Sequence, residues 1–370
     1  MEQIIFRPKL YKFDTLKAFT DEFKVGGSDL ILTNKYIYDP YSDNNKCGAQ
    51  VIYQEEFGGE PTDTMVDAII AEASKKHFER VIAIGGGTVI DIAKVLSVSD
   101  GGSVDSLYDH KDSITKLHQL IIIPTTCGTG SEVTNISIIN RTRLGVKMGL
   151  TSENMFADYA VLVPELLAKL PLKVFGASSI DALVHAVESS LSPKATVYTK
   201  LMGYKAIEMI ITGYQKLVSE GMDKLPQYMG DFLTASNMAG FAFGTAGCAA
   251  VHALSYPLGG TYHVPHGESN YALFTGVLYK YMEKKQDGEI AHLNAYLAEL
   301  LHCDVKNVYN ELENLLNHIL PKKPLHEYGV TEADIPVFTE NVLATQGRLT
   351  ANNFVPLSRD DILDIYKKLY

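Results

Sequence analysis

The sequence predicts an α/β protein of two domains: a parallel sheet with helices over residues 1–164, followed by an all-helical domain over residues 165–370. Three observations carry this prediction. A chain of 370 residues is too long for one small core. Up to Pro164, short apolar runs alternate with amphipathic stretches, which is the pattern of strands joined by helices. After Pro164, helical periodicity takes over and runs of β-branched residues become few.

The N-terminal elements follow in order. We expect strands at residues 29–33, 50–53, 80–84, 119–123 and 158–163, and helices at residues 62–78 and 88–97. The fourth strand segment, residues 119–123, is a continuous apolar run, and Pro124 ends it. Because strands alternate with helices, they should form a parallel sheet covered on both faces, which is the usual frame for a bound nucleotide.

In the C-terminal half we expect helices at residues 179–190, 200–218, 233–256, 291–301 and 305–319. The stretch 238–258 is almost free of charge and holds Gly240, Gly244 and Gly247. We interpret it as a buried helix packed through its small residues rather than a bilayer span, because it includes His252 and no second span accompanies it. The linker between the domains must be short, and the cleft between them is where we expect a site.

Composition narrows the classes of partner. The net charge of -11 disfavours nucleic acid and anionic membranes as partners, because a protein binds either of them through a basic face. Four cysteines lie far apart without a CxxC pair, which fits reduced thiols in a cytoplasmic protein. The first ten residues show no long apolar run and no cleavage signal, so we expect no export. We therefore expect a cytoplasmic protein with a small-molecule substrate, and a homodimer as the usual assembly.

Two glycine-rich turns follow predicted strands. The first is Gly85-Gly86-Gly87-Thr88, which opens a helix that carries Asp91. Glycines let a backbone approach a pyrophosphate, and the helix start offers unpaired N–H groups to the anion. Alone, this turn also fits a tight strand-to-helix connection in which Thr88 and Asp91 cap the helix. A second such turn at residues 124–132, with Thr125, Thr126 and Thr129, makes a dinucleotide the better interpretation.

A metal site is predicted from one aspartate and three histidines. Asp181 and His185 are four residues apart, so a helix places them on one face, beside a stripe of Ile, Leu and Val. His252 lies in the apolar helix and His266 in a loop held by Pro265. Each histidine alone is more often a core residue than a ligand. Together the four offer the ligand types of a divalent first-row metal, which would act as a Lewis acid.

At this point the chain resembles a known family. Four ordered motifs are similar to those of the iron-containing (group III) alcohol dehydrogenases: GGGTVIDIAK, IPTTCGTGSEVT, DALVHAVE and HALSYPLGGTYHVPHG. Within that family the chain is most similar to bacterial 4-hydroxybutyrate dehydrogenases. The resemblance implies that the family's metal ligands fall on Asp181, His185, His252 and His266. It also places the cofactor at Gly86, Gly87, Thr88, Asp91, Thr125, Thr126 and Thr129.

Two departures from the family pattern matter. Many relatives carry a second histidine four residues after the third ligand, and Tyr256 stands there in this chain. Relatives that use only NAD often carry Asp at the end of the second strand, where it repels the 2′-phosphate of NADP. Here that position is Asn34, so the charge argument for NAD is weaker. Fe(II) is the favoured metal and Zn(II) is possible, because both accept this ligand set.

The resemblance implies reversible hydride transfer between 4-hydroxybutyrate and NAD, giving succinic semialdehyde and NADH. Dehydrogenation of another short alcohol or diol (1,3-propanediol, butanol or lactaldehyde type) is the alternative. A dehydroquinate synthase-like lyase would need more charged residues, and a non-enzymatic nucleotide-binding module would leave four ordered ligands unexplained. Tyr256 and His263 are the candidates for proton transfer.

The substrate carboxylate needs a cation or several donors in an apolar pocket. We expect Arg348, with Asn353 nearby, to supply them, because their segment has few charges. Arg143 and Lys147 are the other candidates, and each of the three could also be a solvated surface residue.

Overall fold

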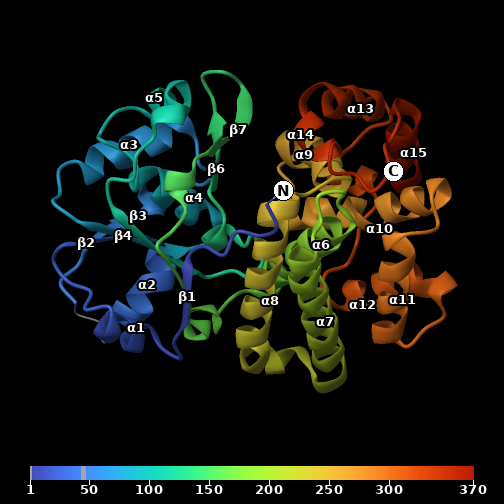
Figure 1. Ribbon diagram of the computed structural model, residues 1–370, viewed down its shortest axis with the longest axis horizontal. Coiled ribbons are helices and arrows are strands. Elements are labelled where there is room, and N and C mark those ends of the chain that lie inside the picture. The colour runs from blue at the N-terminus through green and yellow to red at the C-terminus, as the bar shows by residue number, and fades with distance from the viewer. Residues whose placement is uncertain (1, 43–46) are drawn as a thin grey trace. The chain divides into compact units, whose positions relative to one another are not determined.

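The computed structural model describes residues 2–42 and 47–370, which form two compact units (Figure 1). Residues 6–169 make the sheet unit, and residues 170–370 together with residues 2–5 make the helical unit. The N-terminal residues join the helical unit through contacts such as the bond from the Thr196 hydroxyl to the Gln3 carbonyl, at 2.6 Å. The boundary at Lys169/Leu170 follows a short 3₁₀ turn, Pro164–Leu167, which comes directly after the last strand.

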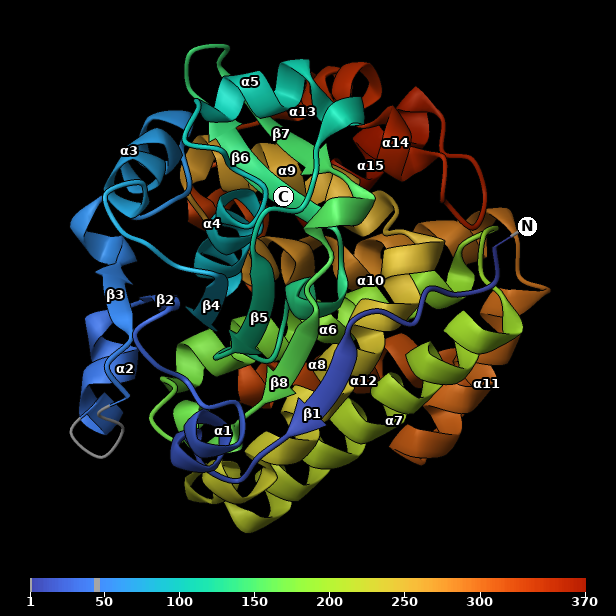
Figure 2. The ribbon, with the colours of Figure 1, turned by 60° about the vertical axis from the view of Figure 1, so that its left-hand side comes forward.

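The sheet unit is built on six parallel strands, in the order β1-β8-β5-β4-β2-β3. Figure 2 shows β1, β8, β5 and β4 side by side. The strands are β1 (Lys9–Lys12), β2 (Asp29–Thr33), β3 (Gln50–Tyr53), β4 (Arg80–Gly85), β5 (Gln119–Pro124) and β8 (Tyr159–Leu162). The parallel sheet predicted from the sequence is confirmed, and five of its strands fall where the apolar runs placed them.

Helices and a hairpin complete this unit. The helices are α1 (Leu16–Glu22), α2 (Lys35–Ser42), α3 (Asp63–Ala73), α4 (Gly87–Leu96) and α5 (Val104–Asp109), and the antiparallel hairpin joins β6 (Ile136–Arg141) to β7 (Val146–Thr151). The prediction of a helix to residue 78 was too long, because the i→i−4 bonding stops after Ser74 and the next two amides bond three residues back. The buried residues of β2, β4 and β5 form one core with α3 and α4.

The helical unit contains no strand within residues 170–370, all of which the structure describes. Its helices are α6 (Leu172–Leu191), α7 (Val197–Glu220), α8 (Leu225–Ala246), α9 (Ala250–Tyr262), α10 (His266–Lys284), α11 (Glu289–Leu301), α12 (Val308–Ile319), α13 (Asp334–Thr345), α14 (Gly347–Thr350) and α15 (Arg359–Leu369). In Figure 1, α6, α7 and α8 lie side by side. Helix α6 is the core of the unit, because every residue from Ile180 to Leu191 is buried.

The prediction of one continuous helix over residues 233–256 was wrong. The chain breaks at Gly247, which has φ 80°, a conformation that ends a helix and that L side chains rarely adopt. Helices α8 and α9 are bent by 105° at this break. Among the described residues, no single helix has the length and hydropathy of a membrane span; the bent pair passes that test only together.

Candidate active site

The two glycine-rich turns lie against each other in the sheet unit. Strands β4 and β5 are neighbours, and Gly85 pairs with Pro124, so both turns leave the same edge of the sheet. Gly86 is the N-cap of α4 and Gly87 its first residue. A Cβ on Gly87 would meet Thr129 Cγ2 at 3.2 Å, and a Cβ on Gly86 would meet Thr126 Cγ2 at 3.5 Å. The glycines therefore let two turns pack together beside a helix N-terminus, an arrangement suited to a pyrophosphate.

Asp91 holds the second turn in place. Its carboxylate accepts hydrogen bonds from the Ser131 hydroxyl at 3.0 Å and from the Ile138 N–H at 2.9 Å. The ammonium of Lys94, which is fully buried, donates to the same Ser131 hydroxyl at 2.7 Å. Burial lowers the pKa of Lys94 to about 8, although the charge of Asp91 opposes this shift. Both side chains thus brace the turn from within the protein. Thr125 is buried, and its N–H donates to the Gly85 carbonyl at 3.1 Å.

Asn34 lies at the end of β2 and is 5% exposed. Its amide nitrogen donates to Gln54 Oε1 at 3.0 Å and to Glu55 Oε2 at 2.8 Å. The side chain that the sequence places beside the cofactor is therefore held by two neighbours that follow β3.

The metal candidates come from three helices of the helical unit. Asp181 and His185 lie one turn apart on α6, His252 lies on α9, and His266 is the first residue of α10. The expectation of a loop at His266 was wrong, because Pro265 caps α10 and His266 begins it. Asp181, His185 and His252 are buried, whereas the His266 side chain is 46% exposed.

All three imidazoles approach one carboxylate oxygen. From Asp181 Oδ1 the distance is 3.6 Å to His252 Nε2, 3.7 Å to His266 Nε2 and 4.0 Å to His185 Nε2. These separations are too long for good hydrogen bonds. Two ligands of one ion, each bonded at about 2.1 Å, lie at most about 4.2 Å apart. The spacing therefore fits a shared cation for Asp181, His252 and His266, whose ligand atoms all lie within 4.8 Å of one another, and His185 lies 4.0 Å from the same Asp181 oxygen.

The chemistry of the donors supports the same fit. His252 Nε2 is buried and has no hydrogen-bond partner among residues 2–42 and 47–370, a costly state for a polar atom that a metal would relieve. Burial alone would raise the pKa of Asp181, but the neighbouring imidazoles outweigh burial and hold it well below its usual range. The carboxylate is therefore charged.

Two residues that the sequence did not single out orient these ligands. Glu188 Oε2 lies 2.6 Å from His252 Nδ1, so a proton on Nδ1 leaves Nε2 free to bind a metal. The Glu188 carboxylate also accepts from the N–H groups of Ala249 and Val251, at 3.0 and 2.6 Å. Asn270 donates from its amide nitrogen to Asp181 Oδ1 at 2.7 Å. Glu188 lies seven residues after Asp181, so the helical spacing of the DALVHAVE motif is a signal that could have found it.

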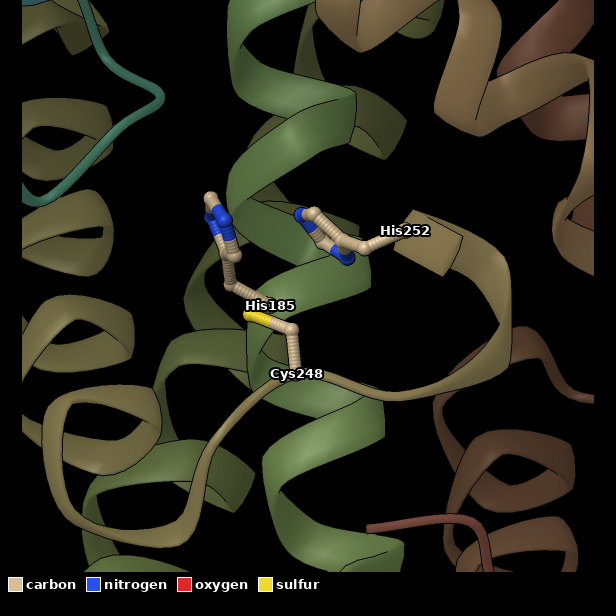
Figure 3. Close-up of side chains that lie close together, drawn as sticks. All are labelled: His185, Cys248 and His252. Carbon is tan, nitrogen blue, oxygen red and sulfur yellow. The ribbon is translucent and has the colours of Figure 1, made fainter. Parts of the chain in front are cut away.

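A second group of possible ligands overlaps the first. The sulfur of Cys248 and one ring nitrogen each of His185 and His252 lie within 4.8 Å of one another, and Figure 3 shows the three side chains close together. Burial raises the pKa of the Cys248 thiol, and the charge of His252 opposes this shift. The neutral thiol is the poorer ligand, whereas Asp181 is already ionised, so the set with Asp181 and His266 is the better cation site.

The residues predicted for proton transfer and substrate binding differ in their surroundings. The Tyr256 ring lies 6.1 Å from that of His266, between centroids, and burial raises the pKa of its phenol. The charge of Arg348, which is exposed, acts in the opposite direction on the pKa of the same phenol. Asn353 is 8% exposed, and its amide oxygen has no hydrogen-bond partner among the described residues. His263 is exposed and ends α9 in the left-handed conformation, at φ 55°.

The other two cations proposed for the substrate are already engaged in the sheet unit. Arg143 bonds Asp67 at 2.8 Å and Asp105 at 2.6 Å, and Lys147 pairs with Glu60 at 2.6 Å. Both side chains belong to ion pairs around the hairpin, which leaves Arg348 as the favoured candidate.

Two family models match the chain. Residues 8–164 match the model for iron-containing alcohol dehydrogenase, and residues 175–370 match the C-terminal model of the Fe-containing alcohol dehydrogenase family. The chain is 47% identical to 4-hydroxybutyrate dehydrogenase of Clostridium kluyveri, over 100% of both proteins. It is 35% identical to long-chain-alcohol dehydrogenase 1 of Geobacillus thermodenitrificans, over 86% of this chain and 82% of that protein.

Solved structures share the fold. Sulfoacetaldehyde reductase from Bifidobacterium kashiwanohense, solved in complex with NAD+, matches with a TM-score of 0.85 at 24% identity, covering 100% of this chain and 99% of that one. A 1,3-propanediol oxidoreductase matches with a TM-score of 0.86 at 22% identity over 100% of both chains. These likenesses extend the agreement in fold over the whole chain.

Proposed function

Because the chain belongs to the iron-containing alcohol dehydrogenase family, we propose that it catalyses the reversible oxidation of 4-hydroxybutyrate by NAD, which gives succinic semialdehyde and NADH. The observation that carries the proposal is the convergence of three imidazoles on the buried Asp181 carboxylate, beside an unpartnered nitrogen of His252. The choice of substrate rests on the 47% identity to the Clostridium kluyveri enzyme over the full length of both chains.

Asp181, His185, His252 and His266 would hold a divalent metal, with Fe(II) favoured and Zn(II) possible. Bound there, the ion supplies a Lewis acid for the oxygen of an alcohol or aldehyde. Glu188 and Asn270 keep the ligands oriented through the bonds described above. The half-exposed ring of His266 marks the side of the site that a substrate can reach.

Arg348 would bind the far end of the substrate. A four-carbon hydroxy acid places its carboxylate about 5–6 Å from its hydroxyl oxygen. The charge of the exposed Arg348 acts on the Tyr256 phenol and could pair with a carboxylate beside it. Asn353 could add a donor only through its amide nitrogen, because its unpartnered oxygen is an acceptor. A charged contact of this kind would favour a hydroxy acid over an alcohol of the same length.

Tyr256 would shape the pocket more than it moves a proton. Its phenol has a raised pKa because it is buried, and a weak acid gives up its proton with difficulty near neutral pH. His263 stays a candidate for proton transfer to solvent, since its ring is exposed and it follows α9 directly.

The nucleotide would bind at the paired glycine turns, with its pyrophosphate at Gly86, Gly87 and Thr88. Thr126 and Thr129 lie where a Cβ on Gly86 or Gly87 would point, and they would line the same site. We propose a cytoplasmic homodimer, because four cysteines in the thiol form suit a reducing compartment and a dimer is the commonest assembly of soluble enzymes.

The proposal is tested by a substrate screen on protein reconstituted with Fe(II) under anaerobic conditions. NADH formation is measured with 4-hydroxybutyrate, 1-butanol and 1,3-propanediol, and NADH consumption with succinic semialdehyde. We expect the highest kcat/KM for 4-hydroxybutyrate in the oxidative direction. A preference for butanol or the diol would assign a different alcohol, and the absence of any net NADH formation or consumption would exclude a dehydrogenase.

A further inference from the structure

The ends of β2 and β3 lie on the same edge of the sheet as the glycine turn after β4. Strand β2 pairs with both neighbours, so Thr33 stands opposite Ile84 on one side and Tyr53 on the other. Residues that follow these strands therefore gather beside the turn proposed for the pyrophosphate. In dinucleotide-binding α/β sheets an acidic side chain at the end of a strand beside the glycine turn bonds the ribose of NAD. Here residue 34, at the end of β2, is a neutral amide.

The hydrogen bonds fix which way that amide points. Gln54 donates from its Nε2 to the Gly58 carbonyl at 2.6 Å, so its oxygen is the atom that faces Asn34. Asn34 must then present its nitrogen, which donates both to Gln54 Oε1 and to Glu55 Oε2. The Asn34 side chain is buried behind these partners, whereas Glu55 is exposed. Of Asn34, Gln54 and Glu55, the side chain that reaches solvent is thus that of Glu55.

The Glu55 carboxylate is held by hydrogen bonds but can accept more of them. Its Oε1 accepts from the Lys35 N–H at 2.6 Å and its Oε2 accepts from Asn34 at 2.8 Å. Each carboxylate oxygen has two lone pairs, so both can still accept a hydroxyl proton. The position and orientation of the Glu55 carboxylate are therefore set before any ligand binds.

The charge around Glu55 is negative. The nearby ammonium of Lys35 lies 2.9 Å from Glu56, which offsets it. Asp39 adds a further carboxylate, bonded to the Tyr53 hydroxyl at 2.6 Å. Lys35 thus faces three acidic groups, those of Asp39, Glu55 and Glu56. The 2′-phosphate of NADP, placed here, would meet a net negative field.

We propose that Glu55 selects NAD over NADP in this protein. Its carboxylate accepts hydrogen bonds from the ribose hydroxyls of the adenosine half and repels a 2′-phosphate. Asn34 acts as a positioning residue that orients Glu55. This inference rests on the proposed function, because it assigns a residue to the nucleotide site of that reaction.

The test is calorimetric titration of NADH and NADPH into the full chain, with Glu55→Gln as the variant. Glutamine keeps one oxygen for Asn34 but removes the charge. We expect wild type to bind NADH more tightly, and Glu55→Gln to shift the ratio of the two dissociation constants by about tenfold toward NADPH. Glu60→Gln is the matched control, since it removes the same charge in the same unit at a residue paired with Lys147, and it should leave the ratio unchanged.

The outcomes separate the possible roles. If Glu55 only caps α2, both nucleotides should weaken equally in Glu55→Gln, and that result would overturn the inference while leaving the dehydrogenase proposal intact. A wild type that binds NADPH as tightly as NADH would overturn it too. A wild type that binds neither nucleotide would reject the proposed function itself. Thermal melts of each variant show whether the fold is kept.

Discussion

At the residue scale, the metal ligands are oriented by side chains that would not touch an ion. Glu188 lies 2.6 Å from the Nδ1 of His252, and Asn270 donates to Asp181. Such bonds fix the ring tautomer and the carboxylate before a metal binds, so less ordering is left for binding itself. The affinity of the site for a metal should therefore depend on these neighbours as well as on the ligands.

Replacing Glu188 with Gln tests this dependence. The amide cannot accept from the His252 ring and from both backbone N–H groups as the carboxylate does, so we expect metal affinity to fall by about 10- to 100-fold. The dissociation constant is measured by competition with a chelating indicator. Glu208→Gln on α7 is the control, because its carboxylate pairs with Lys205 at the surface. An unchanged affinity in Glu188→Gln would show that the bond to His252 does not orient the ligand.

Arg348→Met tests the anchor of the substrate carboxylate. Loss of a charge-assisted contact worth about 2–3 kcal/mol should lower the ratio of kcat/KM for 4-hydroxybutyrate to that for 1-butanol by about 30- to 150-fold. The ratio cancels changes in stability or metal content. Arg359→Met is the control, since Arg359 bonds Glu340 at the surface. A ratio equal to that of wild type would exclude Arg348 as the anchor.

Lys94 makes stability depend on pH. Its pKa of about 8 lies below the usual 10.5 because it is buried. Below pH 8 both folded and unfolded chains carry the proton, and the cost of the buried charge is full. Between pH 8 and 10.5 only the unfolded chain binds the proton, so this residue makes stability rise with pH. Between pH 7.5 and 10, the free energy of unfolding of wild type should rise by on the order of 2 kcal/mol more than that of Lys94→Met, as measured by urea unfolding. A pH-independent difference would contradict the buried charge.

The ligand types were predictable from the sequence, and the helical spacing could also have pointed to Glu188, but the contacts that orient the ligands were not predictable. Asp181 and His185 show a helical spacing, and an aspartate on an apolar face calls for a cation. The link from Glu188 to His252 joins α6 to α9 across 64 residues, and no local pattern encodes it. The same holds for Glu55, whose importance follows from which amide atom Asn34 presents.

At the element scale, the break between α8 and α9 positions His252. The chain turns at Gly247, and α9 begins three residues later, so that His252 falls in its first turn. Asn352 donates to the Cys248 carbonyl at 2.8 Å and holds the connecting residues. The break therefore directs an otherwise apolar helix toward the ligands of α6.

Gly247→Ala should destabilise the protein by about 1–3 kcal/mol, because the backbone has a positive φ and the new Cβ would lie 2.4 Å from Asn352 Nδ2. Gly260→Ala, in the same α9, is the matched control: its Cβ would enter open space, and a helical alanine is neutral or slightly stabilising. Urea unfolding of both variants measures the difference. Equal stability of the two would show that the break at Gly247 tolerates a side chain.

Strands with apolar centres were predicted well, whereas the exposed strand β1 and the amphipathic helix α15 were missed. Strands β2, β4 and β5 are buried along almost their whole length and have apolar centres. Strand β1 is exposed at all four positions and so has no such pattern. The break at Gly247 was missed because both flanking helices are apolar, and a glycine in an apolar run is also common in packed helices.

At the scale of the whole molecule, the proposed chemistry is divided between two units. The glycine turns and Glu55 belong to the sheet unit, whereas the metal candidates and Arg348 belong to the helical unit. Each set of side chains is oriented by contacts within its own unit. Binding of the nucleotide and binding of the metal should therefore be largely independent.

Removal of the metal tests this division. After exhaustive chelation we expect turnover to be lost while the dissociation constant of NADH changes by less than about threefold. The melting temperature should fall as well, because an ion that binds only the folded chain stabilises it by mass action. Calorimetric titration of apo and reloaded protein measures the first effect. Loss of NADH binding together with the metal would contradict the independence of the two sites.

The central claim is that Asp181, His185, His252 and His266 hold the metal. Anomalous diffraction at the iron absorption edge, on crystals of Fe(II)-reconstituted protein, tests it most directly. We expect one strong peak within about 2.0–2.3 Å of an Asp181 oxygen and of a nitrogen of each histidine. A peak bound by Cys248 with His185 and His252, away from Asp181 and His266, would contradict the claim, as would a peak elsewhere in the chain.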